Sequence, residues 1–167
     1  MTTTSPETSP AILPDHEFSA HGHATVLQSN QFMIDYEDNN CLITPNSPNP
    51  ITDWVHVPIS CPTVLDRSMP RISGAAVTVW TGTNPSLAKI NKFYVSKGLS
   101  TFFKKEGMDY QTQKGFESKR FGDEDFPDDV RGPGGISISL EISFARPVPH
   151  NSRWVRIAHA TVEMLNN

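Results

Sequence analysis

The sequence predicts an all-β fold, an antiparallel β-sandwich or jelly-roll-like single domain. Short apolar runs with a two-residue period recur along the chain at intervals of roughly 8–12 residues, separated by turns rich in Gly, Pro and Asn. No segment shows the three-to-four-residue apolar period of an amphipathic helix. Together these observations favour strands packed in layers over helices.

The N-terminal residues 1–15 are rich in Thr, Ser and Pro and contain too few apolar side chains to form a core. We expect them to be a disordered tail, and residues 16–167 to form the β-sandwich domain. In that domain, a first strand region is expected near 18–28 and a second near 32–34. An Asn- and Pro-rich loop at 44–50 follows them.

The strand around Trp54 is the most distinctive element. Successive side chains of a strand point to opposite faces, so Val55, Val57 and Ile59 share one face, which is plain core. Trp54 and His56 share the opposite face. Two interpretations of that second face stay open, a further packed layer or the wall of a ligand pocket.

Two central strands show the same alternation. In the first, Ala75, Val77 and Val79 alternate with Ala76, Thr78 and Trp80. In the second, strict alternation places Ile90 on the same face as Lys92 and Tyr94, opposite Phe93 and Val95.

The C-terminal region gives the clearest strand signal. Apolar and polar residues alternate through 136–144, which predicts a strand with one buried and one polar face. A last long strand is expected at 153–165, where strict alternation places His159 on the same face as Ile157. The long loop at 122–135 has the length of many binding loops.

Composition limits the class of partner. Charged residues make up 19% of the 167 residues, and the formal net charge is −4. The basic groupings are too short to follow a phosphate backbone, and no apolar run approaches the ~18 residues of a membrane helix. We therefore expect a small-molecule partner and neither nucleic acid nor a membrane, while a homodimer stays open.

Two cysteines, Cys41 and Cys61, are present, and small secreted domains usually contain more. The N-terminus has neither the charged nor the apolar region of a signal peptide. We expect a cytoplasmic protein with free thiols, and leave open whether the two cysteines pair.

Two clusters contain the residue types of a metal site. His21 and His23 would place two imidazoles on one face of a strand, as in cupin barrels, but only Gln28 and His159 remain as further ligands. The acidic loop 123–129 lacks the glycine and terminal glutamate of a calcium-binding EF-hand. We expect no metal and no other cofactor.

The remaining candidates for a site are aromatic and basic side chains on the β scaffold. Tryptophans are large apolar plates with one N–H each, and such residues line ligand sites. His56 and Tyr94 can donate a hydrogen bond or a proton, so we expect them to be the catalytic residues. The expected substrate-binding residues are Trp54, Trp80, His159 and Arg156.

Four segments resemble a family of small all-β proteins of unknown function found in bacteria and fungi. They are Gly22-His23-Ala24, Trp54-Val-His56-Val-Pro58-Ile followed by Pro62-Thr-Val, Ala76-Val-Thr-Val, and Gly134-Gly-Ile-Ser-Ile-Ser-Leu-Glu-Ile-Ser-Phe144. The resemblance covers residues 20–145 and implies a β-sandwich without an established chemistry.

The chain is also similar to the small cofactor-free fungal enzymes that couple tropolone quinone methides to humulene-type terpenes by hetero-Diels–Alder reaction. The similarity lies in size, all-β character, low charge and the lack of cofactor motifs. It implies an enzyme of specialised metabolism that holds two apolar reactants in a reactive pose and donates a hydrogen bond to the quinone-methide carbonyl. A cofactor-independent cyclase or cycloaddition catalyst is therefore the leading hypothesis. The alternatives are a non-enzymatic module that binds a carbohydrate or another small molecule, and a cupin-like metalloenzyme.

Overall fold

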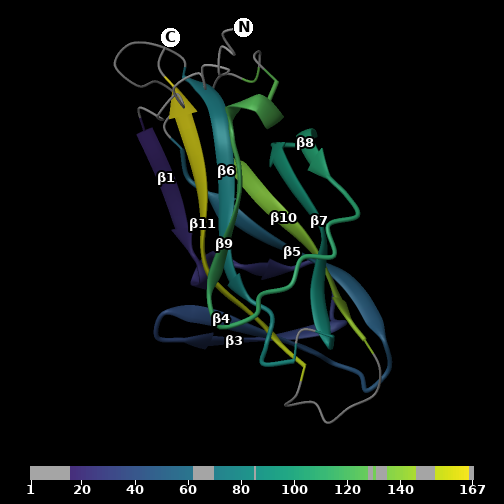
Figure 1. Cartoon of the computed structure of the whole chain (residues 1–167). Coiled ribbons are helices and arrows are strands. Elements are labelled where there is room, and N and C mark those ends of the chain that lie inside the picture. The colour runs from purple at the N-terminus through teal and green to yellow at the C-terminus, as the bar shows by residue number, and fades with distance from the viewer. Residues whose placement is uncertain are drawn as a thin grey trace, which may run out of the picture.

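The chain forms two antiparallel β-sheets that lie one behind the other (Figure 1). A computed structural model describes residues 16–61, 70–84, 86–127, 130, 135–145 and 153–165. The predicted all-β class is confirmed, while the expected tail at 1–15 lies outside the described residues. Within the described ranges, no helix has the length and apolar character needed to cross a membrane.

One sheet has six strands. They are β1 (His16–His21), β3 (Phe32–Glu37), β4 (Asn40–Pro45), β6 (Arg71–Trp80), β9 (Glu117–Phe121) and β11 (Val155–Leu165). The order is β3-β4-β11-β6-β9, and β1 pairs with the same edge of β11 as β4.

The other sheet has five strands. They are β2 (Val26–Leu27), β5 (Ile51–Ile59), β7 (Ala88–Lys97), β8 (Ser100–Lys105) and β10 (Ile136–Phe144), in the order β2-β5-β10-β7-β8. Two 3-10 turns complete the described elements, η1 (Gly22–Ala24) and η2 (Asp123–Asp125).

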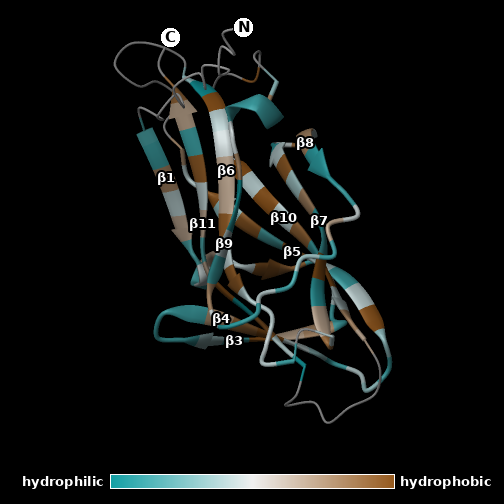
Figure 2. Ribbon diagram, viewed as in Figure 1, coloured by the Kyte–Doolittle hydropathy of each residue, from teal (hydrophilic) through white to brown (hydrophobic). Residues whose placement is uncertain are grey.

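The core lies between the sheets and follows from the alternation of each strand. Val55 and Val57 of β5 are fully buried, as predicted. Figure 2 shows the same alternation of apolar and polar residues along β10. Aromatic rings bridge the two layers, since the ring centroids of Phe93 on β7 and Phe121 on β9 lie 4.8 Å apart.

The predicted faces of β7 need a correction. Ile90 is fully buried, whereas Lys92 and Tyr94 lie on the outer face of the sheet. The pairing of β7 with β10 skips Asn91, so this residue forms a β-bulge. A bulge adds one residue and reverses the alternation, and the strict two-residue period therefore failed here.

A second bulge corrects the predicted faces of the last strand. β11 begins at Val155 rather than at Arg153, and its pairing with β6 skips Ala158. His159 is therefore exposed, whereas Ile157 is fully buried. The two residues lie on opposite faces, contrary to the prediction.

The first expected strand region is interrupted by the turn η1. β1 ends at His21, and the chain then crosses to the five-stranded sheet as β2. Gly22 is required at the crossing because a Cβ there would lie 1.9 Å from the carbonyl oxygen of Ile157.

One buried arginine holds together the ends of several strands. Arg153 is fully buried, and its guanidinium donates hydrogen bonds to the carbonyl oxygens of Ser47 at 2.7 Å, Asn49 at 3.3 Å and Ala145 at 3.4 Å. Ser47 and Asn49 lie where the chain passes from β4 to β5, and Ala145 directly follows β10. Arg153 therefore links strands of both sheets.

Candidate functional site

The outer face of the five-stranded sheet carries an open pocket of about 240 Å³. Three of the six predicted site residues, Trp54, His56 and Tyr94, lie together in it. The full lining is Gln28, Trp54, His56, Tyr94, Ser96, Thr101 and Ser139.

The strand order brings these side chains together. β5 and β7 are the two neighbours of β10. Ser139 on β10 pairs in register with His56 on one side and with Tyr94 on the other. The bulge at Asn91 gives Tyr94 its outward orientation, so the pocket depends on that one extra residue.

Trp54 and Tyr94 form an aromatic platform. Their ring centroids are 4.8 Å apart, and the ring planes are inclined by 49°. The Nζ atom of Lys92 lies 5.8 Å from the Trp54 ring centroid, and that of Lys104 lies 5.6 Å from the Tyr94 ring centroid. Both rings are only half-buried, so the platform offers apolar surface to a ligand.

His56 lies beside the platform and forms a hydrogen bond with a lining residue. Its Nδ1 atom is 2.8 Å from the hydroxyl oxygen of Ser139. Burial lowers the pKa of His56 below its ordinary value of 6.5, and the nearby Asp53 carboxylate opposes this shift only in part. The imidazole is therefore neutral at pH 7, and Nε2 has no hydrogen-bond partner among the described residues.

The charged side chains beside the platform balance one another. Lys92 pairs with Glu141 at 3.0 Å, and Tyr94 donates a hydrogen bond to Glu106. That hydrogen bond is the main cause that raises the pKa of Tyr94, so the phenol stays protonated. With Lys104 counted, two lysines face two glutamates, which favours an uncharged ligand.

The other three predicted site residues lie on the outer face of the six-stranded sheet. Trp80 packs against Trp154 with ring centroids 4.9 Å apart, and the guanidinium of Arg156 lies 4.9 Å from the Trp154 ring. Arg156 also pairs with Glu37 at 3.0 Å. The core separates this cluster from the Trp54 platform, so the six residues do not form one site.

His159 is on the same outer face as Trp80. Its Nε2 atom lies 3.0 Å from the hydroxyl oxygen of Thr78. One ring nitrogen of His159 is thus in contact with a residue of the neighbouring strand β6, away from the Trp54 platform.

The two N-terminal histidines are not on one strand as expected. His21 ends β1, and His23 lies in η1, where its Nε2 contacts the carbonyl oxygen of Glu37. Their ring centroids are 4.4 Å apart. Among the described residues, no three His, Cys, Asp or Glu side chains are placed to hold a metal ion.

The cysteines are unpaired. Cys41 is buried on β4, and Cys61 is half-buried after β5. Burial raises the pKa of Cys61 to about 11 and also raises that of Cys41, so both are thiols at neutral pH.

Four lining residues were not predicted from the sequence: Gln28, Ser96, Thr101 and Ser139. Alternation along 136–144 identifies the face on which Ser139 lies. It does not identify which strands flank that face, and the contact with His56 depends on them. Serine, threonine and glutamine have no distinctive spacing that would have identified the others.

No family model and no curated protein matches this chain. The solved structures to which it is similar include a family 29 carbohydrate-binding module from Piromyces equi, at 8% identity and a TM-score of 0.43 over 87% of this chain and 89% of that chain. The Stig cyclase Fisc from Fischerella sp. TAU, solved with an indole ligand, shows 11% identity and a TM-score of 0.45 over 97% of this chain and 81% of that chain. A family 11 carbohydrate-binding module from Clostridium thermocellum, in complex with a mixed-linked tetrasaccharide, shows 12% identity and a TM-score of 0.40 over 95% of this chain and 94% of that chain. These values are too low to transfer a ligand or an activity to this chain.

Proposed function

We propose that the outer face of the five-stranded sheet binds a neutral carbohydrate. The observation that carries this proposal is the half-buried pair of Trp54 and Tyr94 in an open pocket. One face of a sugar ring presents C–H groups, and its edge presents hydroxyl groups. An aromatic plate surrounded by polar groups fits both features.

The polar groups around the platform match a hydroxylated ligand. The hydroxyls of Ser96, Thr101 and Ser139 and the amide of Gln28 both donate and accept hydrogen bonds, as sugar hydroxyls do. The neutral imidazole of His56 adds a further group of this kind. The balanced charges beside the platform support a neutral sugar over an acidic one.

A calorimetric titration with a panel of neutral oligosaccharides tests the proposal. Trp54→Ala should weaken binding by roughly tenfold or more, because it removes a central aromatic anchor. Phe116→Ala is the matched control, since Phe116 is an exposed aromatic residue beside Trp80, away from the platform. Absence of binding by every panel member, or equal affinity of the Trp54→Ala variant and the wild type, would contradict the proposal.

A second candidate function is cofactor-free cyclisation or cycloaddition at the same platform. The neutral His56 beside Tyr94 favours it, because a hydrogen-bond donor next to an aromatic plate can orient and activate an apolar reactant. Incubation with a quinone methide and a terpene acceptor tests it. His56→Ala should lower the rate by about 10²-fold at an unchanged melting temperature, and His159→Ala is the control. Unimpaired turnover by the folded His56→Ala variant would remove this residue from the mechanism.

A further inference from the structure

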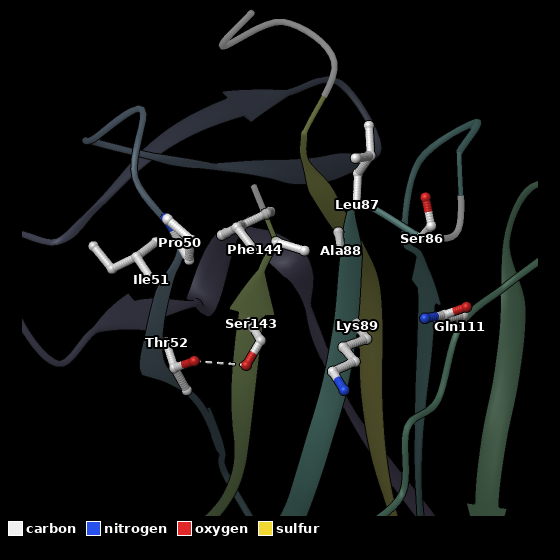
Figure 3. A pocket seen from close by; sticks show the side chains of 11 residues that line it. Pro50, Ile51, Thr52, Ser86, Leu87, Ala88, Lys89, Gln111, Ser143 and Phe144 are labelled. Carbon is white, nitrogen blue, oxygen red and sulfur yellow. Dashed lines mark hydrogen bonds between the residues drawn. The ribbon is translucent and has the colours of Figure 1, made fainter. Parts of the chain in front are cut away.

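A second cavity, of about 540 Å³, lies at one end of the same five-stranded sheet (Figure 3). Apolar side chains, among them Pro50 and Leu87, form part of its lining. Thr52 on β5 and Ser143 on β10 contribute hydroxyl groups, and Gln111 contributes an amide. The cavity thus offers the same mixture of apolar surface and neutral polar groups as the platform.

The cavity opens on the same face of the sheet as the platform. Thr52 precedes Trp54 by two positions on β5, and Ser143 follows Ser139 by four positions on β10. Residues separated by an even number of positions on a strand share a face. One continuous sheet surface therefore carries both pockets.

Hydrogen-bonded polar groups connect the two pockets. The hydroxyl oxygens of Thr52 and Ser143 are 2.6 Å apart, as Figure 3 shows with a dashed line. The side-chain amide of Asn91 donates to Ser143 and, at 3.4 Å, to Glu141. Glu141 lies between Ser139 and Ser143 on the same face of β10, so the space between the pockets is lined by polar groups.

The separation of the pockets sets the length of a ligand that fills both. Four residues of antiparallel strand span roughly 14 Å, at about 3.4 Å per residue. A single six-membered ring is much shorter than this. A carbohydrate that contacts both Ser139 and Ser143 must therefore be a chain of linked sugar rings.

The charge next to the cavity is also balanced. Lys89 lines the cavity, and its ammonium group pairs with the carboxylate of Asp109. Lys89 is the only charged residue among those that the structure describes as lining the cavity, so the pair leaves this lining without an unbalanced charge. The cavity therefore fits the same neutral, hydroxylated chemistry as the platform.

We infer that this cavity is a second subsite of the platform, and that the ligand is an oligosaccharide rather than a single sugar. The inference rests on the proposed carbohydrate binding. The platform holds one ring against Trp54 and Tyr94, and the cavity holds a later ring of the same chain between Leu87, Thr52 and Gln111.

Titration with matched disaccharides and hexasaccharides of glucan, mannan and xylan type tests the inference. The wild type should bind the hexasaccharide about tenfold or more tightly than the disaccharide, because the second contact is intramolecular. The double variant Thr52→Val/Gln111→Ala should reduce this ratio to near one. Thr52 is exposed and Gln111 is half-buried, so the fold should tolerate both changes. The control Thr83→Val/Gln31→Ala removes the same groups from exposed positions outside both pockets and should keep the wild-type ratio.

Three results would overturn the inference, and they distinguish a failure of the second subsite from a failure of the proposed function. Affinity that does not depend on chain length, or a double variant that keeps the wild-type ratio, overturns the second subsite. If Trp54→Ala still weakens binding in that case, the proposed function stands. Absence of binding at either length overturns both.

Discussion

At the scale of single residues, the protonation state of His56 follows from its surroundings. The ring is half-buried and contacts Ser139 through Nδ1. Burial lowers its pKa below 6.5 in the folded protein, and Asp53 opposes this only in part. The unfolded chain therefore takes up a proton at this residue more readily than the folded chain.

This difference predicts a loss of stability in mild acid. A depressed folded-state pKa contributes stability that is fully present above the unfolded value of 6.5 and is lost as the pH falls through the folded pKa. His56→Asn should therefore flatten the melting temperature against pH between about pH 8 and pH 5. Gln31→Ala, at an exposed position without a titratable group, should leave the wild-type slope. Parallel curves for His56→Asn and the wild type would show that this histidine is not the titrating group.

Sequence reasoning identified three of the seven lining residues of the candidate site, and two of them for a local reason. Trp54 and His56 share a face because they are two positions apart, and no other part of the chain changes that. Tyr94 reaches them only through the register of β7 with β10 and the bulge at Asn91. Trp80 and Arg156 have the same chemical character, but they lie on the other sheet, and sheet membership depends on pairings between distant segments.

At the scale of elements, irregular positions decide where side chains point. The bulges at Asn91 and Ala158 reverse the alternation of β7 and β11. The turn η1 ends the first strand early, and Gly22 packs directly on β11 there. At both bulges the apolar period of the sequence shifts by one residue: two polar residues separate Ile90 from Phe93, and Ala158 directly follows Ile157. A strict two-residue period, applied along the whole strand, overlooks this shift.

The close approach at Gly22 predicts a large effect of one methyl group. In Gly22→Ala, the Cβ would overlap the carbonyl oxygen of Ile157, and a strand backbone must shift to make room. We expect a loss of stability of about 1–3 kcal/mol or more, measured by urea denaturation. Gly135→Ala is the matched control, because no atom lies within 4 Å of its added Cβ. This control should change stability by less than about 1 kcal/mol. Equal losses in the two variants would contradict the account of η1.

At the scale of the whole molecule, the fold class was predictable because many short strands repeat the same local pattern. The order of the strands was not, since β1, β4 and β6 all pair with β11 from distant parts of the chain. The role of Arg153 could not be predicted from the sequence either. A buried arginine that binds carbonyl groups of two connections has no signature in a single sequence.

Arg153 gives a prediction about the cohesion of the two sheets. Arg153→Met keeps much of the buried volume but removes the donors to Ser47, Asn49 and Ala145. The free energy of unfolding should fall by at least about 1.5 kcal/mol, the contribution of one hydrogen bond to a charged group. Lys105→Met, at an exposed position, should stay within about 0.5 kcal/mol of the wild type. An equally small effect of Arg153→Met in the same denaturation series would show that Arg153 does not hold the strand ends.

The arrangement of the three tryptophans offers the most direct test of ligand binding at the platform. Trp54 lies on the outer face of the five-stranded sheet, while Trp80 and Trp154 form a cluster on the other sheet. Each indole N–H gives its own resonance in a spectrum of the ¹⁵N-labelled protein. Titration with the neutral oligosaccharide panel should shift the Trp54 resonance in a saturable way and leave the Trp80 and Trp154 resonances in place. A shift of the Trp80 or Trp154 resonance with an unmoved Trp54 signal, or no shift of any of them, would contradict binding at the platform.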